Sequence, residues 1–239
     1  MCFIKGVLFL IFLSHATAVI PNYIHVCEAN DPEISKCIVK VINEIKPKLR
    51  GGIPELDVPA MEPLHLDAIR LRRGVQSNIT DLKVFGASSF QILELKAHIP
   101  SNTFTFKLKI PRLEFGGKYE LNMNLLFITL QGNGPIYGNF TDYAVDVFMK
   151  GNKIMQNGEE YLKFDKMKLN VRLGAAQLRL ENLFNGDKFL GDATNAIVND
   201  NIDIFINEIK PSLENALSEK LTDIANRITL RFTYKELFL

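Results

Sequence analysis

Residues able to do chemistry are few in this sequence, and their spacing does not fit catalysis. His25, His65 and His98 follow the first eighteen residues, and none stands at a metal-ligand spacing from another histidine or a cysteine. No Gly-x-Ser-x-Gly motif supplies a nucleophile, and the segment 132–138, GNGPIYG, lacks the spacing of a dinucleotide-binding loop. We therefore expect isolated surface histidines, no catalytic residue, no metal site and no cofactor.

The first eighteen residues are typical of a secretory signal peptide. Lys5 stands near the start, an apolar run follows, and Ala16-Thr17-Ala18 fits the small-residue cleavage pattern. We expect residues 1–18 to be removed and residues 19–239 to form a single domain that is secreted to the extracellular space. No later apolar run is long enough for a membrane helix, so we expect no stable membrane insertion.

Cys27 and Cys37 are the cysteines that remain after Cys2 leaves with the signal peptide. An even pair in an oxidising compartment favours a disulfide bond, and two free buried thiols are the alternative. Secretion also makes Asn78 and Asn139, in the sequons NIT and NFT, candidate N-glycosylation sites whose occupancy is left open.

The charge balance argues against polyanionic partners. The chain carries 28 Lys and Arg residues against 27 Asp and Glu residues, which gives a formal net charge of +1. Because nucleic acids and anionic membranes call for a basic surface, we expect neither as a partner.

The stretch 183–230 is the element around which the rest of the chain must be built. Large apolar residues recur every three or four positions, which predicts an amphipathic helix from about Asp192 to Ile228. Such a helix would be roughly 55 Å long at 1.5 Å per residue. Pro211 interrupts it, since a proline removes one backbone hydrogen bond. We expect a continuous helix bent at Pro211, with two separate helices as the alternative.

A second, shorter helix is predicted near the N-terminus. Asp31-Pro32 supplies a capping acid and a proline suited to the first helical position. Apolar residues then follow at helical spacing from Ile34 to Leu49, and Gly51-Gly52 ends the element.

Between the two helices the apolar period changes from 3.6 residues to two, which indicates strands. The alternation is clear over 103–110, 119–125, 143–149 and 169–173, and weaker over 64–71, 78–85, 90–99 and 177–180. Gly116-Gly117, Asn133-Gly134-Pro135 and Asn157-Gly158 separate the runs and are expected to form hairpin turns. Seven or eight strands joined by short turns predict an antiparallel sheet.

These elements define an α+β fold. The arrangement that buries the apolar faces of both helix and sheet is a long kinked C-terminal helix wrapped by a highly curved antiparallel sheet, with a short N-terminal helix. Large side chains pointing inward would leave room between the sheet and the helix.

Several short blocks carry a resemblance to a known family. They are 182–191 (NLFNGDKFLG), 199–201 (NDN), 208–211 (EIKP) and 234–238 (YKELF), together with the Cys27/Cys37 pair, 52–56 (GIPEL), 59–64 (PAMEPL), 78–80 (NIT) and 84–86 (VFG). In these blocks the sequence resembles the takeout and haemolymph juvenile-hormone-binding protein family of insects. Ile202 is a departure, because family members often carry Trp after the block at 199–201.

The resemblance implies a TULIP-like fold with an elongated apolar cavity. It also implies a secreted, non-enzymatic carrier of one small hydrophobic ligand, such as juvenile hormone, another terpenoid, a fatty acid or a semiochemical. Haemolymph or sensory fluid is the implied location, and roles in feeding, circadian rhythm and chemosensation are attributed to the family. A receptor or carrier partner is left unspecified.

Candidate ligand contacts are the inward residues of the predicted strands and the helix residues that face them. They are Phe104, Phe106, Leu108, Met123, Leu125, Tyr143, Val145, Val147, Phe205, Ile209 and Leu213. The alternative for each is ordinary core packing. A different class of function, a secreted signalling or interaction module, would follow if Phe104, Phe106 and Phe205 occluded the interior.

Overall fold

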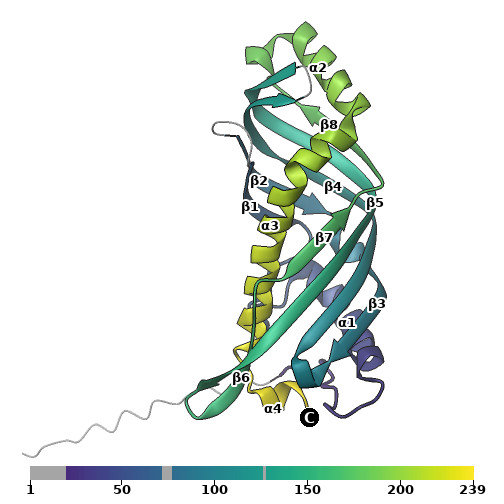
Figure 1. The fold of residues 1–239 in the computed structure, drawn as a ribbon, viewed down its shortest axis with the longest axis vertical. Coiled ribbons are helices and arrows are strands. Elements are labelled where there is room, and N and C mark those ends of the chain that lie inside the picture. The colour runs from purple at the N-terminus through teal and green to yellow at the C-terminus, as the bar shows by residue number, and fades with distance from the viewer. Residues whose placement is uncertain (1–19, 72–76, 126–127) are drawn as a thin grey trace, which may run out of the picture.

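The protein is an elongated, curled sheet wrapped around its C-terminal helices (Figure 1). The computed structural model describes residues 20–71, 77–125 and 128–239. The expected signal peptide, 1–18, lies outside these ranges. Within them, no helix is both long enough and apolar enough to cross a membrane.

Eight strands form one antiparallel sheet. They are β1 Leu64–Arg70, β2 Asn78–Phe85, β3 Gln91–His98, β4 Thr103–Leu125, β5 Ile128–Gln156, β6 Glu159–Phe164, β7 Lys168–Arg172 and β8 Ala175–Leu180. The long strands β4 and β5 pair with each other from Thr103–Lys150 to Leu125–Ile128 and form the spine. On one side, β2 and β3 pair with β4, and β1 follows β2 at the edge. On the other, β8, β7 and β6 pair with successive parts of β5.

Two of the three expected turns are wrong, because their glycines lie inside the long strands. Gly116-Gly117 is part of β4, and Gly134 is part of β5. A Cβ at Gly134 would lie 2.6 Å from the carbonyl oxygen of Glu181. Glycine therefore marks a close backbone approach here and not a turn. The turn at Asn157-Gly158 is confirmed, and it leads into β6, which the sequence pattern did not predict.

The C-terminal helix is broken at Asn201 and not at Pro211. α2 spans Lys188–Asp200 and α3 spans Ile202–Thr229, so Pro211 lies inside α3. Asn201 leaves the helical region at φ −121°, and its side-chain Nδ2 donates to the carbonyl of Ile197 at 2.9 Å. Asn207, four residues before Pro211, is exposed, so water can satisfy the carbonyl that lacks a donor. The helix therefore stays continuous through Pro211, as expected, and the unexpected break lies about three helical turns earlier.

Two further helices close the lower end of the molecule in Figure 1. α1 spans Ile34–Gly51, as expected, and the short α4 spans Tyr234–Leu237. The predicted disulfide between Cys27 and Cys37 is confirmed, with a Cα–Cα distance of 6.1 Å. It holds the segment before α1 against a small apolar cluster shared by α1, β6 and α4.

Asparagines of α2 pair with the outer edge of β8. Asn195 accepts from the backbone N–H of Leu180 at 2.8 Å and donates to its carbonyl at 2.9 Å. Asn199, one turn later, does the same with Leu178, both distances being 2.8 Å. Each amide thus replaces the neighbouring strand that β8 lacks, and no edge peptide at these two residues is left without a partner.

The polar face of α3 makes the same kind of contact along β6 and the start of β7, and we call this row of hydrogen bonds between helix side chains and the sheet edge the seam. Asn226 accepts from the N–H of Phe164 at 2.7 Å and donates to its carbonyl at 3.0 Å. Thr222 accepts from the N–H of Met167 at 2.9 Å, and Ser218 donates to the carbonyl of Met167. The helix is therefore joined to the sheet edge by side-chain hydrogen bonds to backbone, which fix its position along the strands.

Replacing Asn226 by alanine should destabilise the protein by about 1 to 3 kcal/mol, because the N–H and carbonyl of Phe164 both lose their partner. Urea unfolding gives the free energy of unfolding. The control is Asn215→Ala on the same helix, where the amide contacts only the exposed side chains of Lys166 and Glu219. We expect that control to stay within about 0.5 kcal/mol of the wild type. Equal losses of unfolding free energy in the two variants would contradict a stabilising role for the hydrogen bonds between Asn226 and Phe164.

Candidate ligand-binding cavity

An apolar cavity lies between the concave face of the sheet and α3. Its volume is about 340 Å³, near the lower end of the roughly 300 to 1,000 Å³ that is usual for ligand sites. From α3, the side chains of Phe205, Ile209, Leu213, Leu217 and Leu221 line it. Their four-residue spacing places them on one helix face, about 100° around α3 from the residues that bond to the sheet edge.

The structure places most of the predicted contact residues on this cavity. Those that line it are Leu108, Tyr143, Val145, Val147, Phe205, Ile209 and Leu213. They lie there because β4, β5 and α3 keep the clear periods that the sequence shows. Their contact with a ligand stays a prediction.

The remaining predicted residues do not line the cavity. Phe104 packs with Phe164 and Phe238, with ring centroids 5.8 and 6.5 Å away, in the cluster beneath the cavity. Phe106 packs at the boundary between that cluster and the main core. Met123 is buried in the main core but outside the lining, and the side chain of Leu125 lies outside the described part of the structure.

Sequence periodicity missed one wall of the cavity, which β1 and β2 form. Leu66 and Ile69 of β1 and Ile79 and Leu82 of β2 line the cavity at three-residue spacing, which interrupts the alternation. The cause is a β-bulge: the β2–β4 register shifts between Thr80 and Lys83, and Asp81 has φ 52°. The sequence signal that could have located the bulge is an aspartate inside a weak strand, because aspartate tolerates positive φ better than most residues.

Tyr143 carries the one hydroxyl among the residues that line the cavity. Within the described ranges this hydroxyl makes no hydrogen bond, so it is available to a polar group of a ligand. Burial raises the pKa of Tyr143, and the nearby carboxylate of Glu214 raises the pKa further. Glu214 is itself held in place, because its Oε1 accepts from the N–H of Val171 at 2.8 Å.

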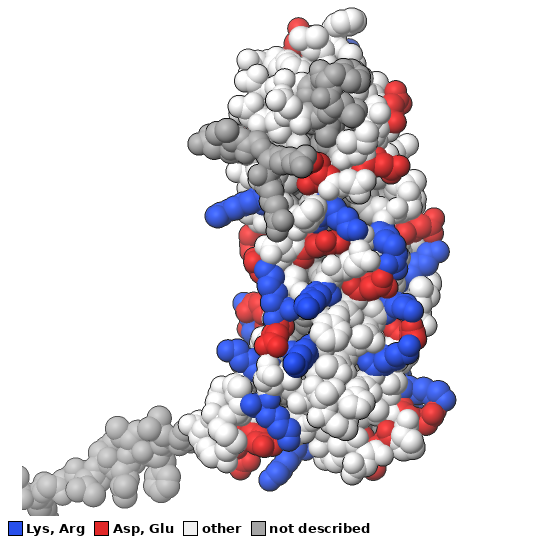
Figure 2. Space-filling model, in the orientation of Figure 1, with Lys and Arg blue, Asp and Glu red and all other residues white. Residues whose placement is uncertain are grey.

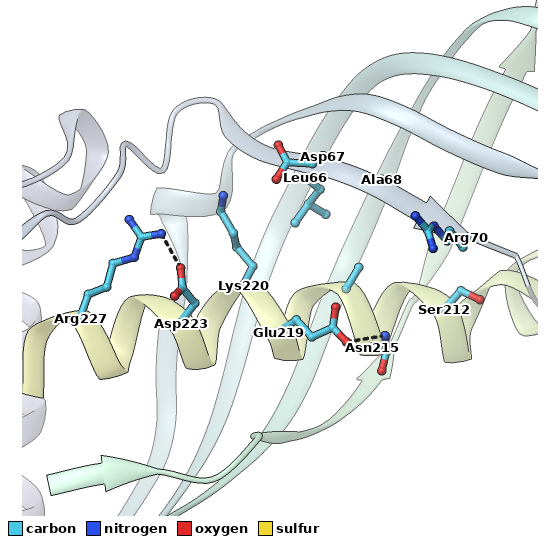
Figure 3. Close-up of a pocket in the computed structure, with 11 residues that line it drawn as sticks. Leu66, Asp67, Ala68, Arg70, Ser212, Asn215, Glu219, Lys220, Asp223 and Arg227 are labelled. Atoms are coloured by element: carbon cyan, nitrogen blue, oxygen red, sulfur yellow. Dashed lines mark hydrogen bonds and ion pairs between the residues drawn. The ribbon is translucent and has the colours of Figure 1, made fainter. Parts of the chain in front are cut away.

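A polar groove runs between the edge strand β1 and α3, outside the cavity (Figure 3). Its volume is about 750 Å³, and charged side chains of both signs line it. Leu66 belongs to the linings of both the groove and the cavity, so its buried side chain stands between the two spaces.

Other kinds of site find little support in the described part of the chain. No group of three His, Cys, Asp or Glu side chains among the described residues could hold a metal ion. Figure 2 shows Lys and Arg interspersed with Asp and Glu over the visible face, in keeping with the near-neutral composition.

A curved antiparallel sheet that encloses a long helix and an apolar cavity defines the TULIP-like class of fold. Among solved structures, Takeout 1 of Epiphyas postvittana shares it with a TM-score of 0.76, at 21% identity, over 89% of this chain and 98% of that chain. The family model for haemolymph juvenile hormone binding protein (JHBP) matches residues 7–239, so the chain belongs to that family. The resemblance noted in the sequence is thereby confirmed.

Curated relatives are similar along most of their length. The circadian clock-controlled protein daywake of Drosophila melanogaster is 23% identical over 231 residues, which cover 91% of this chain and 88% of that protein. Daywake of Drosophila yakuba is 23% identical over 215 residues, which cover 84% of this chain and 83% of that protein.

The raised pKa of Tyr143 predicts a loss of stability at alkaline pH. A tyrosine in the unfolded chain ionises near pH 10, whereas the folded protein keeps Tyr143 protonated at higher pH. The unfolded state therefore loses its proton first, and the free energy of unfolding falls as the pH rises above about 10.

Tyr143→Phe removes this contribution and leaves the other tyrosines unchanged. Between about pH 9 and pH 11 the variant should lose less stability than the wild type, by up to about 1.4 kcal/mol for each pH unit above 10. Urea unfolding at each pH measures the difference. Parallel pH curves for the two proteins would contradict the burial of a neutral hydroxyl at this position.

Proposed function

We propose that this protein is a secreted, non-enzymatic carrier that holds one small hydrophobic ligand in the cavity between the sheet and α3. The single observation that carries the proposal is the cavity itself. It is about 340 Å³ in volume, its lining is apolar, and it has one hydroxyl, from Tyr143, that is free to select a ligand with a polar group.

The energetics of such a site are sufficient without charge or metal. Burial of about 400 Å² of apolar ligand surface contributes roughly 10 kcal/mol at 25 cal/mol per Å². Association and ordering oppose it by at least about 4 kcal/mol. The remaining 6 kcal/mol or so corresponds to a dissociation constant of tens of micromolar, and good complementarity would tighten it.

The relatives and the sequence support the finer parts of the proposal. The family is named for juvenile hormone, which makes that hormone, another terpenoid, a fatty acid or a semiochemical a reasonable ligand. The name of daywake suggests a circadian role. The signal-like residues 1–18 support secretion into haemolymph or sensory fluid, and Asn78 and Asn139 remain proposed glycosylation sites.

The rival proposal, a signalling module with an occluded interior, has less support. Phe104 and Phe106, which were expected to take part in the occlusion, lie outside the cavity lining. Phe205 lines the cavity and is fully buried, but the space beside it is not filled.

Filling the cavity should abolish ligand uptake without unfolding the protein. Ala87 lines the cavity, and Ala175 is exposed on β8. Ala87→Phe therefore fills the cavity, and Ala175→Phe is the control that makes the same substitution outside it. We expect delipidated wild type and Ala175→Phe to bind the neutral fluorescent probe N-phenylnaphthylamine, and Ala87→Phe to bind it at least about tenfold more weakly.

Thermal unfolding of each variant shows that it is folded. Failure of the folded wild type to bind the probe, together with a native mass spectrum free of any bound lipid, would refute the carrier function. Equal binding by Ala87→Phe would show that the probe binds elsewhere.

A further inference from the structure

The groove between β1 and α3 identifies the class of ligand, provided that the proposed function holds. We propose that this groove binds the head group of the ligand at Arg70 and Ser212, and that the ligand is a single-chain lipid with a carboxylate, such as a fatty acid. The hydrocarbon chain occupies the apolar cavity.

The groove and the cavity together match the two ends of such a molecule. Leu66 of β1 is 3% exposed and separates the two spaces, since it lines both. On α3, Ala216 lines the groove, whereas Leu213 and Leu217 line the cavity. A hydrocarbon chain that passes Leu66 would therefore move from the polar groove to the apolar cavity within the width of a single helix.

Ser212 lines one end of the groove, and its hydroxyl is itself buried and unpaired. The residue is 6% exposed, and its Oγ has no hydrogen-bond partner in the described structure. Buried hydroxyls in folded proteins are nearly always paired, so an orphaned one in a groove points to a missing acceptor. A carboxylate oxygen is such an acceptor.

Arg70 supplies a matching positive charge from the opposite side. Figure 3 shows it on β1, across the groove from Ser212 on α3. Within the described ranges Arg70 forms no ion pair, and Glu208, one turn before Ser212, has an interaction of its own. A guanidinium binds a carboxylate through two parallel N–H donors, which suits a fatty-acid head group.

The other charged side chains of the groove are paired or lie away from the end that holds Arg70 and Ser212. Glu219 is paired with Lys166 at 2.8 Å. Asp223 is paired with Arg227 at 2.7 Å. Lys220 lies about two turns of α3 from Ser212, and Figure 3 shows it extending toward β1, the strand that carries the oppositely charged Asp67. Among the described residues that line the groove, Arg70 is therefore the unpaired cation at the end that holds Ser212.

The test compares a charged lipid with its neutral ester. Palmitic acid and methyl palmitate compete for the delipidated full chain against N-phenylnaphthylamine, which is neutral. The variants are Arg70→Gln and Ser212→Ala, and the control is Lys163→Gln, which removes an exposed charge from β6, away from the groove. If Ser212→Ala does not fold, the exposed Arg70→Gln carries the test alone.

We expect Arg70→Gln to weaken palmitic acid roughly tenfold, and Ser212→Ala to weaken it roughly fivefold. Methyl palmitate should bind both variants as it binds the wild type, and Lys163→Gln should change neither ligand. Unchanged binding of palmitic acid in Arg70→Gln, or a parallel loss of the ester, would overturn the head-group site while leaving a carrier function intact. If the wild type binds neither the probe nor either lipid, the carrier function fails, and the head-group site fails with it.

Discussion

The structure depends on hydrogen bonds between helix side chains and the backbone of an open sheet edge. A curled antiparallel sheet that does not close into a barrel leaves a row of unpaired peptide groups, and burying them without partners would be costly. Here Asn195, Asn199 and Asn226 each accept from and donate to a single edge residue, as a neighbouring strand would. Because this pairing is local and directional, it fixes both the position of the helices along the strands and the rotation of α3 about its axis.

The apolar cavity is a consequence of that rotation. With Ser218, Thr222 and Asn226 bonded to the edge, α3 turns its leucine, isoleucine and phenylalanine stripe toward the concave face. The opposite flank of α3 faces β1, and the charged groove lies between the described parts of these two elements. One flank of the helix is thus joined to the sheet, and the other borders the polar groove, which Leu66 separates from the cavity.

Much of this architecture follows from periodicity, and what does not follow has identifiable physical causes. Residues 103–110 and 143–149 alternate cleanly, so the places of Leu108, Tyr143, Val145 and Val147 on the cavity are predictable. The sequence around Gly134 is typical of a turn. In the structure, however, this position needs glycine because the backbone of Glu181 comes too close for a side chain, which only the folded sheet reveals. The bulge at Asp81 hides the β1–β2 wall, and Asn201 ends α2 through a side-chain bond that no apolar pattern reveals.

The central proposal is that the space beside α3 receives a hydrocarbon chain. The most direct measurement is the anomalous diffraction of a crystal grown with a fatty acid brominated at its methyl end. A bromine peak enclosed by Phe205, Leu213 and Val145 is the predicted result. A peak found only on the outer surface, with the interior unoccupied or collapsed, would contradict it.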